Sequence, residues 1–322
     1  MQPLVSIITP SYNKQQFILE TINSVINQTY QNWELILVDD MSSDETIIVA
    51  KQFSEKDNRI KIFVNEKNKG ANYCRNFGLK QAQGEYVIFL DADDLLGKTC
   101  LENRVKKAQE NSDKNLWVFA MGVFKKEIGD DNSKWQPTSR QPLQDFLQHK
   151  LPWSILQPLW KRSFLVELNG FDETFERLQD VELHTRALLH SSIKWYQFSE
   201  IMDCYYRIDE ERKNFNSYQF LKRWINSSVL YCNKFEKIVS SSDKKYLFGT
   251  VLKTYFQLIY NYRLLKITQQ QFEELKQKLL SCELCKELSA TKKMLFNAFY
   301  FYHSKCPRVP GINFLFEKLI VL

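Results

Sequence analysis

The sequence predicts an α/β protein whose N-terminal part is a mainly parallel sheet flanked by helices. Over the first ninety residues, short apolar runs alternate with segments in which apolar side chains recur at helical spacing. Polar or acidic residues directly follow three of these apolar runs. Strands that alternate with helices form β-α-β units, and a parallel sheet binds ligands beyond the carboxyl ends of its strands. The three strand ends therefore mark the expected functional edge.

Each element is expected from its own pattern. Pro10 to Asn13 is expected to break the first strand, and Ser42, Ser43 or Asp44 to cap the second helix. Gly129 to Pro142 reads as a polar loop. The expected strands are Leu4 to Thr9, Trp33 to Val38, Ile60 to Val64, Tyr86 to Leu90, Trp117 to Phe124 and Ile201 to Ile208. The expected helices are Phe17 to Ile26, Ser42 to Phe53, Cys74 to Ala82, Leu101 to Ala108 and Asp180 to Leu189.

The composition is that of a soluble globular protein with two parts. The chain has 322 residues, of which 44% are hydrophobic and 25% charged. We expect a catalytic domain over residues 1–214 and an α-helical region over 215–322. The chain has no apolar run long enough to span a membrane and no secretory signal, so a cytoplasmic location is expected. Its seven cysteines are scattered, as in reduced thiols, and Cys282-x-x-Cys285 has no second pair beside it.

Charge divides the chain unevenly. From Asn216 onward there are 14 Lys and 3 Arg against 1 Asp and 6 Glu, a balance of +10 that leaves −4 for the remainder. A basic, aromatic-rich end suits an anionic membrane surface, whereas an ordinary solvated helical face or a homodimer contact explains it equally well. No nucleic-acid partner is expected. The residues concerned are Tyr255, Phe256, Ile259, Tyr260 and Leu264 of one amphipathic helix, then Phe296, Phe299, Tyr300 and Phe314 to Phe316.

The run Asp91-Ala92-Asp93-Asp94, directly after an apolar strand, is the most informative feature. Three carboxylates in four residues repel one another unless a counter-charge is present. Alternation along a strand would send Asp91 and Asp93 the same way. Such a pair suits a hard divalent cation, Mn²⁺ or Mg²⁺, that keeps open positions for phosphates. The alternative is a solvated acidic turn.

Five segments, in order along the chain, carry a resemblance to a known family. They are Val5 to Asn13, Val38 to Asp44, Asn68 to Gly78, Gly84 to Asp94 and Gly170 to Arg186. Together they resemble the family 2 glycosyltransferases of the GT-A fold, of the bacterial surface-polysaccharide type, over roughly residues 1 to 210. The resemblance implies a nucleotide-sugar donor, with UDP as the expected nucleotide, a divalent metal, inversion at the anomeric carbon, and a hydroxyl of a glycan or lipid-linked sugar as acceptor.

The resemblance gives the nucleotide site its expected residues. Thr9, Pro10 and Tyr12 would form the floor beneath the base. Asp40, together with Asp39, would accept hydrogen bonds from the base or ribose; the alternative role for both is to cap the next helix. In the same comparison Arg75 would contact phosphate, its alternative being a surface helix residue, and Asp91 would contact the ribose or the metal.

The resemblance also implies how the reaction is divided. Asp93, with Asp91, would hold the metal and the diphosphate, and Asp94 would help them. Asp180 would be the general base for the acceptor hydroxyl, although the family commonly has Glu at the position of Gln179. The alternative role for Asp180 is a helix N-cap.

Other residues have smaller expected roles. Glu182 would replace Asp180 only if the register differed by two residues, and Arg186 is expected to be structural. The loop from Leu151 to Trp160, with Trp153, would influence the choice of donor.

Two positions depart from the family pattern. Met41 stands where the family usually has Gly, which would constrain that turn. The segment Tyr205-Tyr206-Arg207 matches a late family motif only weakly.

Three other functions are alternatives to glycosyl transfer. A catalytically degenerate nucleotide-sugar-binding or scaffold protein would keep the same residues. A phosphatase that uses D-x-D after a strand wants Thr or Val where this chain has Leu95, and it normally uses the first strand. A dinucleotide-dependent oxidoreductase wants G-x-G-x-x-G after the first strand, which this sequence does not have.

Overall fold

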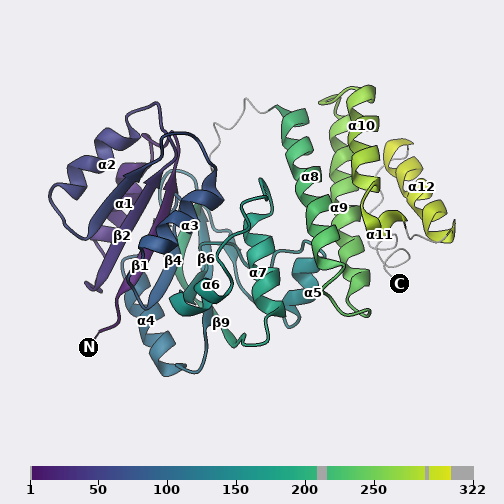
Figure 1. Ribbon diagram of the computed structural model, residues 1–322. Coiled ribbons are helices and arrows are strands. Elements are labelled where there is room, and N and C mark those ends of the chain that lie inside the picture. The colour runs from purple at the N-terminus through teal and green to yellow at the C-terminus, as the bar shows by residue number, and fades with distance from the viewer. Residues whose placement is uncertain (1, 209–215, 287–289, 306–322) are drawn as a thin grey trace. The chain divides into compact units, whose positions relative to one another are not determined.

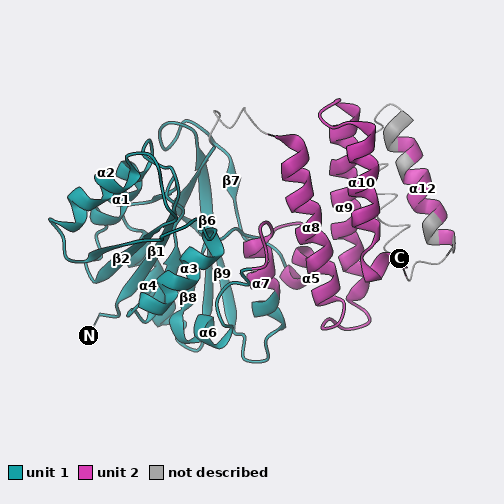
Figure 2. Ribbon diagram, turned by 45° about the horizontal axis from the view of Figure 1, so that its top comes forward, with its two compact units in different colours: residues 1–140, 152–173, 186–211 teal, residues 141–151, 174–185, 212–322 magenta. Residues whose placement is uncertain are grey.

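The computed structural model describes residues 2–208, 216–286 and 290–305 (Figure 1). Contacts divide the chain into two compact units (Figure 2). The first unit contains residues 1–140, 152–173 and 186–211, and the second contains residues 141–151, 174–185 and 212–322. The second unit therefore includes two short segments from within the expected catalytic region. The boundary also falls inside the helix α7, Gln179–Leu189.

The first unit is built on one sheet with the strand order β3-β2-β1-β4-β8-β6-β9-β5, and β7 pairs with β6 at the side. β1, β2, β3 and β4 run parallel to one another. This half has the parallel β-α-β architecture that the sequence predicts. The strands are β1 Val5–Ser11, β2 Trp33–Asp39, β3 Ile60–Val64, β4 Tyr86–Phe89, β5 Leu95–Leu96, β6 Leu116–Phe124, β7 Lys134–Trp135, β8 Pro158–Lys161 and β9 Trp195–Arg207.

The first strand continues through Pro10, contrary to the predicted break. Ile8 pairs with Phe89 at the end of the β1–β4 ladder, and the Leu90 N–H donates to the Ile8 carbonyl. Pro10 lies two residues farther along, so its missing N–H faces the same side, where that ladder has already ended. On the other side, β1 stays paired with β2 as far as Ser11. The proline is tolerated because no sheet hydrogen bond is lost.

The other half of the sheet is mixed, which the sequence analysis did not predict. β8 is antiparallel to β4 and β6, and β5 is antiparallel to β9, whereas β6 and β9 are parallel. β9 begins at Trp195, six residues before the expected start at Ile201. β7 lies within the segment expected to be a plain polar loop. β5 and β7 have two residues each, too few to produce a periodic signal.

Helices connect these strands and cover the sheet. α3 packs on β1 and β2 so closely that a Cβ at Gly78 would lie 2.4 Å from the Ile8 Cγ2 atom. α2 begins later than predicted, and neither Ser42 nor Ser43 caps it; the Thr46 N–H donates instead to the Asp44 carboxylate, at 3.1 Å. The helices are α1 Ile18–Ile26, α2 Thr46–Ser54, α3 Ala71–Gln81, α4 Cys100–Glu110 and α6 Arg162–Glu167.

The second unit is helical. α8, α9 and α10 pack on one another, and α12 and α5 pack on α9. The Asn216 side chain caps α8, and a capping box of Thr268 and Gln271 begins α10. Its helices, besides the start of α7, are α5 Pro142–Leu147, α8 Ser217–Phe235, α9 Lys244–Arg263, α10 Gln269–Leu280, α11 Glu283–Lys286 and α12 Ala290–Lys305.

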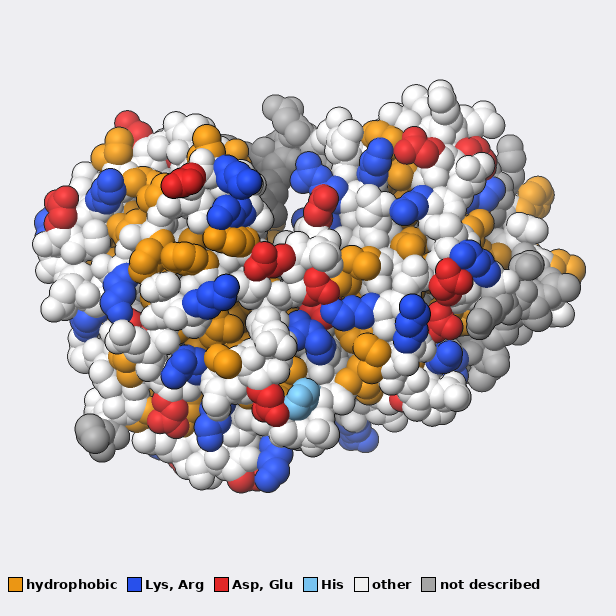
Figure 3. Space-filling model, viewed as in Figure 1, with side chains coloured by type: hydrophobic (Ala, Val, Ile, Leu, Met, Phe, Trp, Pro, Cys, Tyr) orange, Lys and Arg blue, Asp and Glu red, His pale blue; other side chains and the backbone are white. Residues whose placement is uncertain are grey.

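Two aromatic side chains expected to be available for a membrane are core residues instead. Phe296 and Phe299 of α12 are buried and stack on Tyr255 of α9, with ring centroids 5.4 Å and 6.2 Å apart. Phe301 is exposed, the Tyr300 side chain lies outside the described part, and so do residues 314–316. On the face seen in Figure 3, Lys and Arg side chains lie interspersed with Asp and Glu over these helices.

The described cysteines, six of the seven, are free and buried. Cys282 and Cys285 Sγ atoms are 3.2 Å apart. Among the described helices, none is both long and apolar enough to cross a membrane.

Candidate functional site

The predicted residues at the ends of three adjacent strands come together in the first unit. β1 is central and pairs with β2 on one side and β4 on the other. Thr9 lies near the end of β1, Asp39 and Asp40 end β2, and the acidic run follows β4. Because these strands are parallel and adjacent, their carboxyl ends meet at one edge of the sheet. The expected functional edge therefore exists.

The acidic run forms a turn and does not continue the strand. β4 ends at Phe89, and the Asp94 N–H donates to the Asp91 carbonyl at 3.0 Å. Strand alternation consequently does not set the directions of these side chains, and that argument was wrong. The solvated-turn alternative also fails, because Asp93 and Asp94 are only 7% and 2% exposed. From α1, the Thr21 hydroxyl donates to the Asp94 carbonyl at 3.0 Å and holds the turn in place.

Two basic side chains of the chain supply the counter-charge. The Arg75 Nη2 atom lies 2.7 Å from Asp91 Oδ1, and the Lys14 ammonium is ion-paired with Asp93 Oδ2. Arg75 is buried, so it is not the surface residue of the alternative interpretation; its guanidinium also lies over the Phe171 ring. The two pairs differ in exposure: the Arg75 side chain is 6% exposed and that of Lys14 is 23% exposed.

Arg207 braces the same turn from β9. Its backbone N–H donates to Asp94 Oδ1 at 2.9 Å and its Nε to the Asp93 carbonyl at 2.8 Å. Its Nη2 atom is 2.6 Å from Glu20 Oε2 on α1. Burial raises the pKa of the Asp94 carboxyl well above its usual value, and the nearby charges of Asp91 and Asp93 add to this rise.

The carboxylates of Asp39 and Asp40 accept hydrogen bonds from backbone N–H groups of nearby loops. The carboxylate of Asp40 accepts from the N–H groups of Lys69 and Gly70, at 2.8 and 2.7 Å, just before α3. Asp39 accepts from the N–H of Ser42 at 2.8 Å. Neither carboxylate caps the helix α2 that follows. A carboxylate has about four acceptor positions, so their expected contact with a base or ribose stays a prediction.

The expected floor of the nucleotide site mixes buried and exposed groups. The hydroxyl of Thr9, and that of Ser11 two residues on, are buried with no hydrogen-bond partner among the described residues. The Tyr12 ring is 49% exposed. Met41 is also exposed and has a φ of +67°, so the turn that normally takes Gly does adopt a left-handed conformation here.

Two asparagines on one face of α3 hold the segment after α6. Asn72 Nδ2 donates to the Asp172 carbonyl and Asn76 Nδ2 to the Phe171 carbonyl, at 2.8 and 2.9 Å. Arg186 donates to the Leu168 and Gly170 carbonyls, which confirms its structural role. Residues 171 and 172 are thereby fixed to the helix that carries Arg75.

The predicted base lies in the other unit. Asp180 is the second residue of α7 and belongs to the second unit, so its role stays a prediction. Glu182 is fully buried and its Oε1 atom is 2.8 Å from Lys234 Nζ, which makes it a poor substitute base. Trp153, in the first unit, is fully buried against Trp195 and packs as a core residue.

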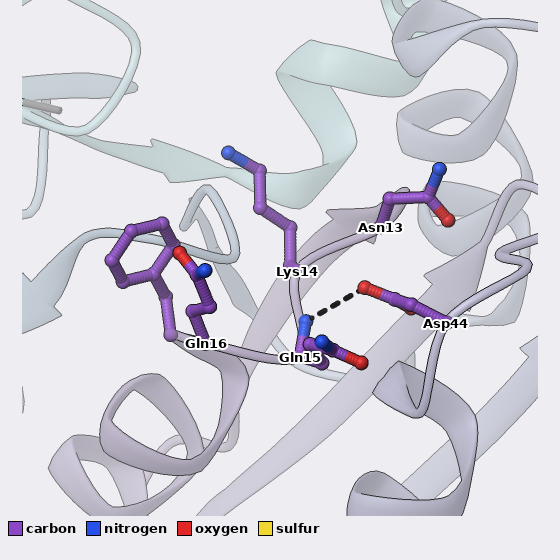
Figure 4. A pocket seen from close by; sticks show the side chains of 6 residues that line it. Asn13, Lys14, Gln15, Gln16 and Asp44 are labelled. Atoms are coloured by element: carbon purple, nitrogen blue, oxygen red, sulfur yellow. Dashed lines mark hydrogen bonds between the residues drawn. The ribbon is translucent and has the colours of Figure 1, made fainter. Parts of the chain in front are cut away.

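The loop between β1 and α1 lines a pocket with Asp44. Figure 4 shows Lys14 extending away from the Asn13 and Asp44 side of this pocket, and the Gln15 N–H bonded to Asp44 at 3.1 Å. The Asn13 N–H donates to the Ser42 hydroxyl and the Lys14 N–H to Thr46 Oγ1, at 2.8 and 2.7 Å. These bonds fix the backbone that carries Lys14.

The site could hold a divalent cation through few ligands of the chain. No group of three or more His, Cys, Asp or Glu side chains in the described part is arranged to bind a metal. Asp91 and Asp93 nevertheless offer hard oxygen donors of the kind that Mn²⁺ and Mg²⁺ prefer, and such ions often use one or two carboxylates plus substrate phosphates and water. Asp91 and Asp93 therefore fit a cation whose remaining coordination positions are filled by a bound ligand.

Sequence reasoning did not single out Lys14, Glu20 or Ser11. Lys14 follows directly on the matched segment Val5 to Asn13, but its partner Asp93 is 79 residues away. The available signal in the sequence was that Lys14 is a basic residue next to the motif at the end of the first strand.

The N-terminal part of the chain is similar to known proteins. Residues 6–160, just under half of the 322 residues, match the sequence model of the family described as Glycosyl transferase family 2. This part of the chain therefore resembles glycosyltransferase family 2. Over 111 residues it is 45% identical to TuaG of Bacillus subtilis (strain 168), provisionally named a teichuronic acid biosynthesis glycosyltransferase. Over 109 residues it is 47% identical to WfgD of Escherichia coli, named a UDP-Glc:alpha-D-GlcNAc-diphosphoundecaprenol beta-1,3-glucosyltransferase.

These matches are partial in length. Each covers 34% of this chain, and they cover 44% of TuaG and 42% of WfgD. The relatives' activities therefore come to this chain only as proposals.

Solved structures share the fold. TarS 1–349 of S. aureus has a TM-score of 0.65 at 19% identity, over 98% of this chain and 90% of that one. The mannosyltransferase PcManGT of Pyrobaculum calidifontis, solved with GDP-Man and Mn²⁺, has a TM-score of 0.56 at 17% identity, over 99% and 87%. The chain has the α/β fold of these two structures.

Proposed function

We propose that this chain is an inverting, metal-dependent glycosyltransferase that moves a sugar from a nucleotide diphosphate sugar to a hydroxyl group. The expected nucleotide is UDP. The observation that carries the proposal is the meeting of Thr9, Asp40 and the acidic turn at the ends of three adjacent parallel strands, within the residues that match family 2.

The donor would bind along this edge. The exposed Tyr12 ring offers a flat apolar face for the base, and the remaining acceptor positions of Asp39 and Asp40 suit its N–H or the ribose hydroxyls. The buried hydroxyls of Thr9 and Ser11 are further donors at the same edge. Arg75, held beside Asp91, places a fixed positive charge where the diphosphate is expected.

Asp91 and Asp93 are proposed to hold the cation. When bound, a divalent cation stabilises the negative charge that grows on the leaving diphosphate. The turn that presents these carboxylates is rigid because Thr21 and Arg207 hold its backbone. Such prior positioning means that little reorganisation is needed when the sugar–phosphate bond breaks.

Asp180 is proposed as the general base. Its carboxylate would take the proton of the acceptor hydroxyl, whose oxygen attacks the anomeric carbon opposite the leaving group and inverts it. Support comes from its place in the segment Gly170 to Arg186, which resembles the family, and from the buried ion pair with Lys234 that removes Glu182 as a candidate.

The acceptor is proposed to be a glycan or a lipid-linked sugar, because the name of WfgD specifies a diphosphoundecaprenol-linked acceptor. Peripheral contact with an anionic membrane belongs to this proposal, although Phe296 and Phe299 are core residues. Exposed candidates among the described residues include Met294 and Phe301 of α12, which are 67% and 63% exposed, and Leu264 after α9, which is 47% exposed. Binding to anionic liposomes that is unchanged in the Met294→Ser/Phe301→Ser variant would count against their part in it. Size-exclusion chromatography with light scattering would test a homodimer.

A donor screen tests the reaction. UDP-, GDP- and dTDP-sugars are incubated with the full chain and Mn²⁺, and release of the nucleotide diphosphate is measured. We expect turnover with a UDP-sugar that is lost with EDTA and in Asp93→Ala. The exposed Asp113→Ala is the matched control and should retain activity. Turnover that survives both EDTA and Asp93→Ala contradicts the proposed mechanism.

A degenerate binding or scaffold protein is the second candidate, since it would keep the same residues. Calorimetric titration with UDP, with and without Mn²⁺, separates the two candidates. Binding without turnover for any donor would support the scaffold.

A further inference from the structure

Two carboxylates of the acidic turn are paired with basic side chains without a cation. Asp91 and Asp93 carry two negative charges, and their partners Arg75 and Lys14 carry two positive ones. A divalent cation added alone would leave an excess of positive charge, and a diphosphate added alone an excess of negative charge. When the cation and the diphosphate bind together, their opposite charges offset each other. Each is therefore expected to favour binding of the other.

The two basic partners are not equally able to move. Arg75 is buried on α3, and its guanidinium lies 5.3 Å from the Phe171 ring centroid. Lys14 has an anchored backbone but a partly exposed side chain that extends from the loop between β1 and α1 (Figure 4). Its four-carbon stem lets the ammonium change partner while the loop stays in place.

Lys14 also competes directly with a cation. Its ammonium is paired with an oxygen of Asp93, one of the two carboxylates proposed to hold the metal. A cation that approaches this oxygen meets a like charge at short range, so one of them has to leave. A departing ammonium at this edge of the sheet is well placed to meet the phosphates of a donor.

We propose that Lys14 is an exchangeable counter-cation of Asp93, which releases this carboxylate when a divalent cation binds and turns to the diphosphate of the donor. Cation and nucleotide then bind cooperatively, and Lys14 keeps the cation affinity low until a nucleotide is present. This inference rests on the proposed function for the identity of the anion, a nucleoside diphosphate.

The test is metal binding in the full-length chain. The signal of free Mn²⁺ in electron paramagnetic resonance gives the Kd, with and without UDP, at constant ionic strength. Without UDP, we expect Lys14→Met to bind Mn²⁺ about three- to tenfold more tightly than wild type, since the competing ion pair is gone. The factor by which UDP increases Mn²⁺ affinity should shrink by a similar amount.

Two variants make the result specific. Lys14→Arg keeps the counter-charge and should stay near wild type. Lys114→Met removes a lysine of similar exposure, 26%, that is paired with Asp113, and should match wild type in both measurements. Thermal unfolding of each variant checks that it is folded.

The outcomes separate the two ideas. Unchanged or weaker Mn²⁺ binding by Lys14→Met without UDP overturns the exchange, even if UDP binds and sugar is transferred. Failure of wild type to bind UDP with or without Mn²⁺ overturns the proposed function, while the comparison of Mn²⁺ affinity without UDP still decides whether Lys14 competes with the cation.

Discussion

Arg104 and Asp203 form an ion pair with almost no exposed surface. Arg104 Nη2 is 2.7 Å from Asp203 Oδ1, and the two side chains are 0% and 1% exposed. A second nitrogen of the guanidinium donates to the Leu156 carbonyl at 3.0 Å. The Asp203 carbonyl in turn accepts from the Gly97 N–H at 2.8 Å, directly after β5. The pair thus joins α4 and β9 beneath the strand that follows the acidic turn.

Removal of one partner of this pair should be strongly destabilising. In Arg104→Met the Asp203 carboxylate stays buried without its counter-charge, and a loss of about 3–5 kcal/mol in the free energy of unfolding is expected. Urea unfolding followed by circular dichroism measures this. Lys107→Met removes an exposed partner of Glu110 and should cost less than about 1 kcal/mol. Equal losses in the two variants would contradict the role assigned to Arg104.

Asp94 should make the chain less stable as pH rises. Its pKa in the folded chain lies well above the usual 3.8, because the carboxyl is buried beside Asp91 and Asp93. Between these two values the folded chain holds a proton that the unfolded chain has released, so stability falls with increasing pH by up to about 1.4 kcal/mol per pH unit.

Asp94→Asn cannot titrate, but its side-chain oxygen can still accept from the Arg207 N–H. The unfolding free energy of the variant minus that of wild type should therefore increase from about pH 4 upward. Asp113 is the control of opposite sign, since Lys114 lowers its pKa. The difference for Asp113→Asn should not rise over the same range. A flat difference for Asp94→Asn would mean that this carboxyl ionises normally in the fold.

The sequence was a good guide to the N-terminal strands for a physical reason. β2 is buried along its whole length, and apart from Glu34 its residues from Trp33 to Val38 are apolar, so the strand stands out in the sequence. β5 and β7 instead owe their existence to pairing with β9 and β6, which come from distant parts of the chain. The antiparallel half of the sheet depends on such long-range pairings, so the local sequence gives little indication of its strands.

The site divides in the same way. The carboxylates at the ends of β2 and β4 were visible because they stand beside apolar runs. Lys14 was not visible, since it reaches Asp93 across 79 residues. Arg207 lies in a segment that matches the family only weakly, and its contact with the Asp93 carbonyl spans 114 residues. The acidic run implied that a counter-charge was needed, but only the fold shows that the chain supplies one itself.

Met41 should be replaceable by Gly with a gain in stability. Its φ of +67° is unfavourable for a side chain with a Cβ, and the side chain is 54% exposed, so little packing is lost. Met41→Gly removes the strain at this φ and should raise the free energy of unfolding by up to about 1 kcal/mol. The greater conformational entropy of Gly in the unfolded chain offsets part of this gain. Met41→Ala keeps the Cβ and should stay near wild type. If both variants behave alike, backbone strain at this turn is not the reason.

Two buried histidines should make the second unit sensitive to acid. Burial lowers the pKa of His149 and of His184 to about 3 in each case, with the Lys253 charge adding to the effect on His149. The unfolded chain takes up these protons as pH falls below 6.5, whereas the folded chain does so only near pH 3. Each histidine should therefore remove about 1.4 kcal/mol of stability per pH unit between these values.

Chemical unfolding followed by circular dichroism between pH 7 and pH 4 measures this dependence. His149→Gln/His184→Gln should unfold with a shallower pH dependence than wild type, by about 2.7 kcal/mol per pH unit in that window. The variant can be less stable at pH 7, because it alters packing against Trp224 and Phe146, but packing loss alone does not change the slope. A parallel pair of curves for wild type and the double variant would show that other groups cause the acid sensitivity.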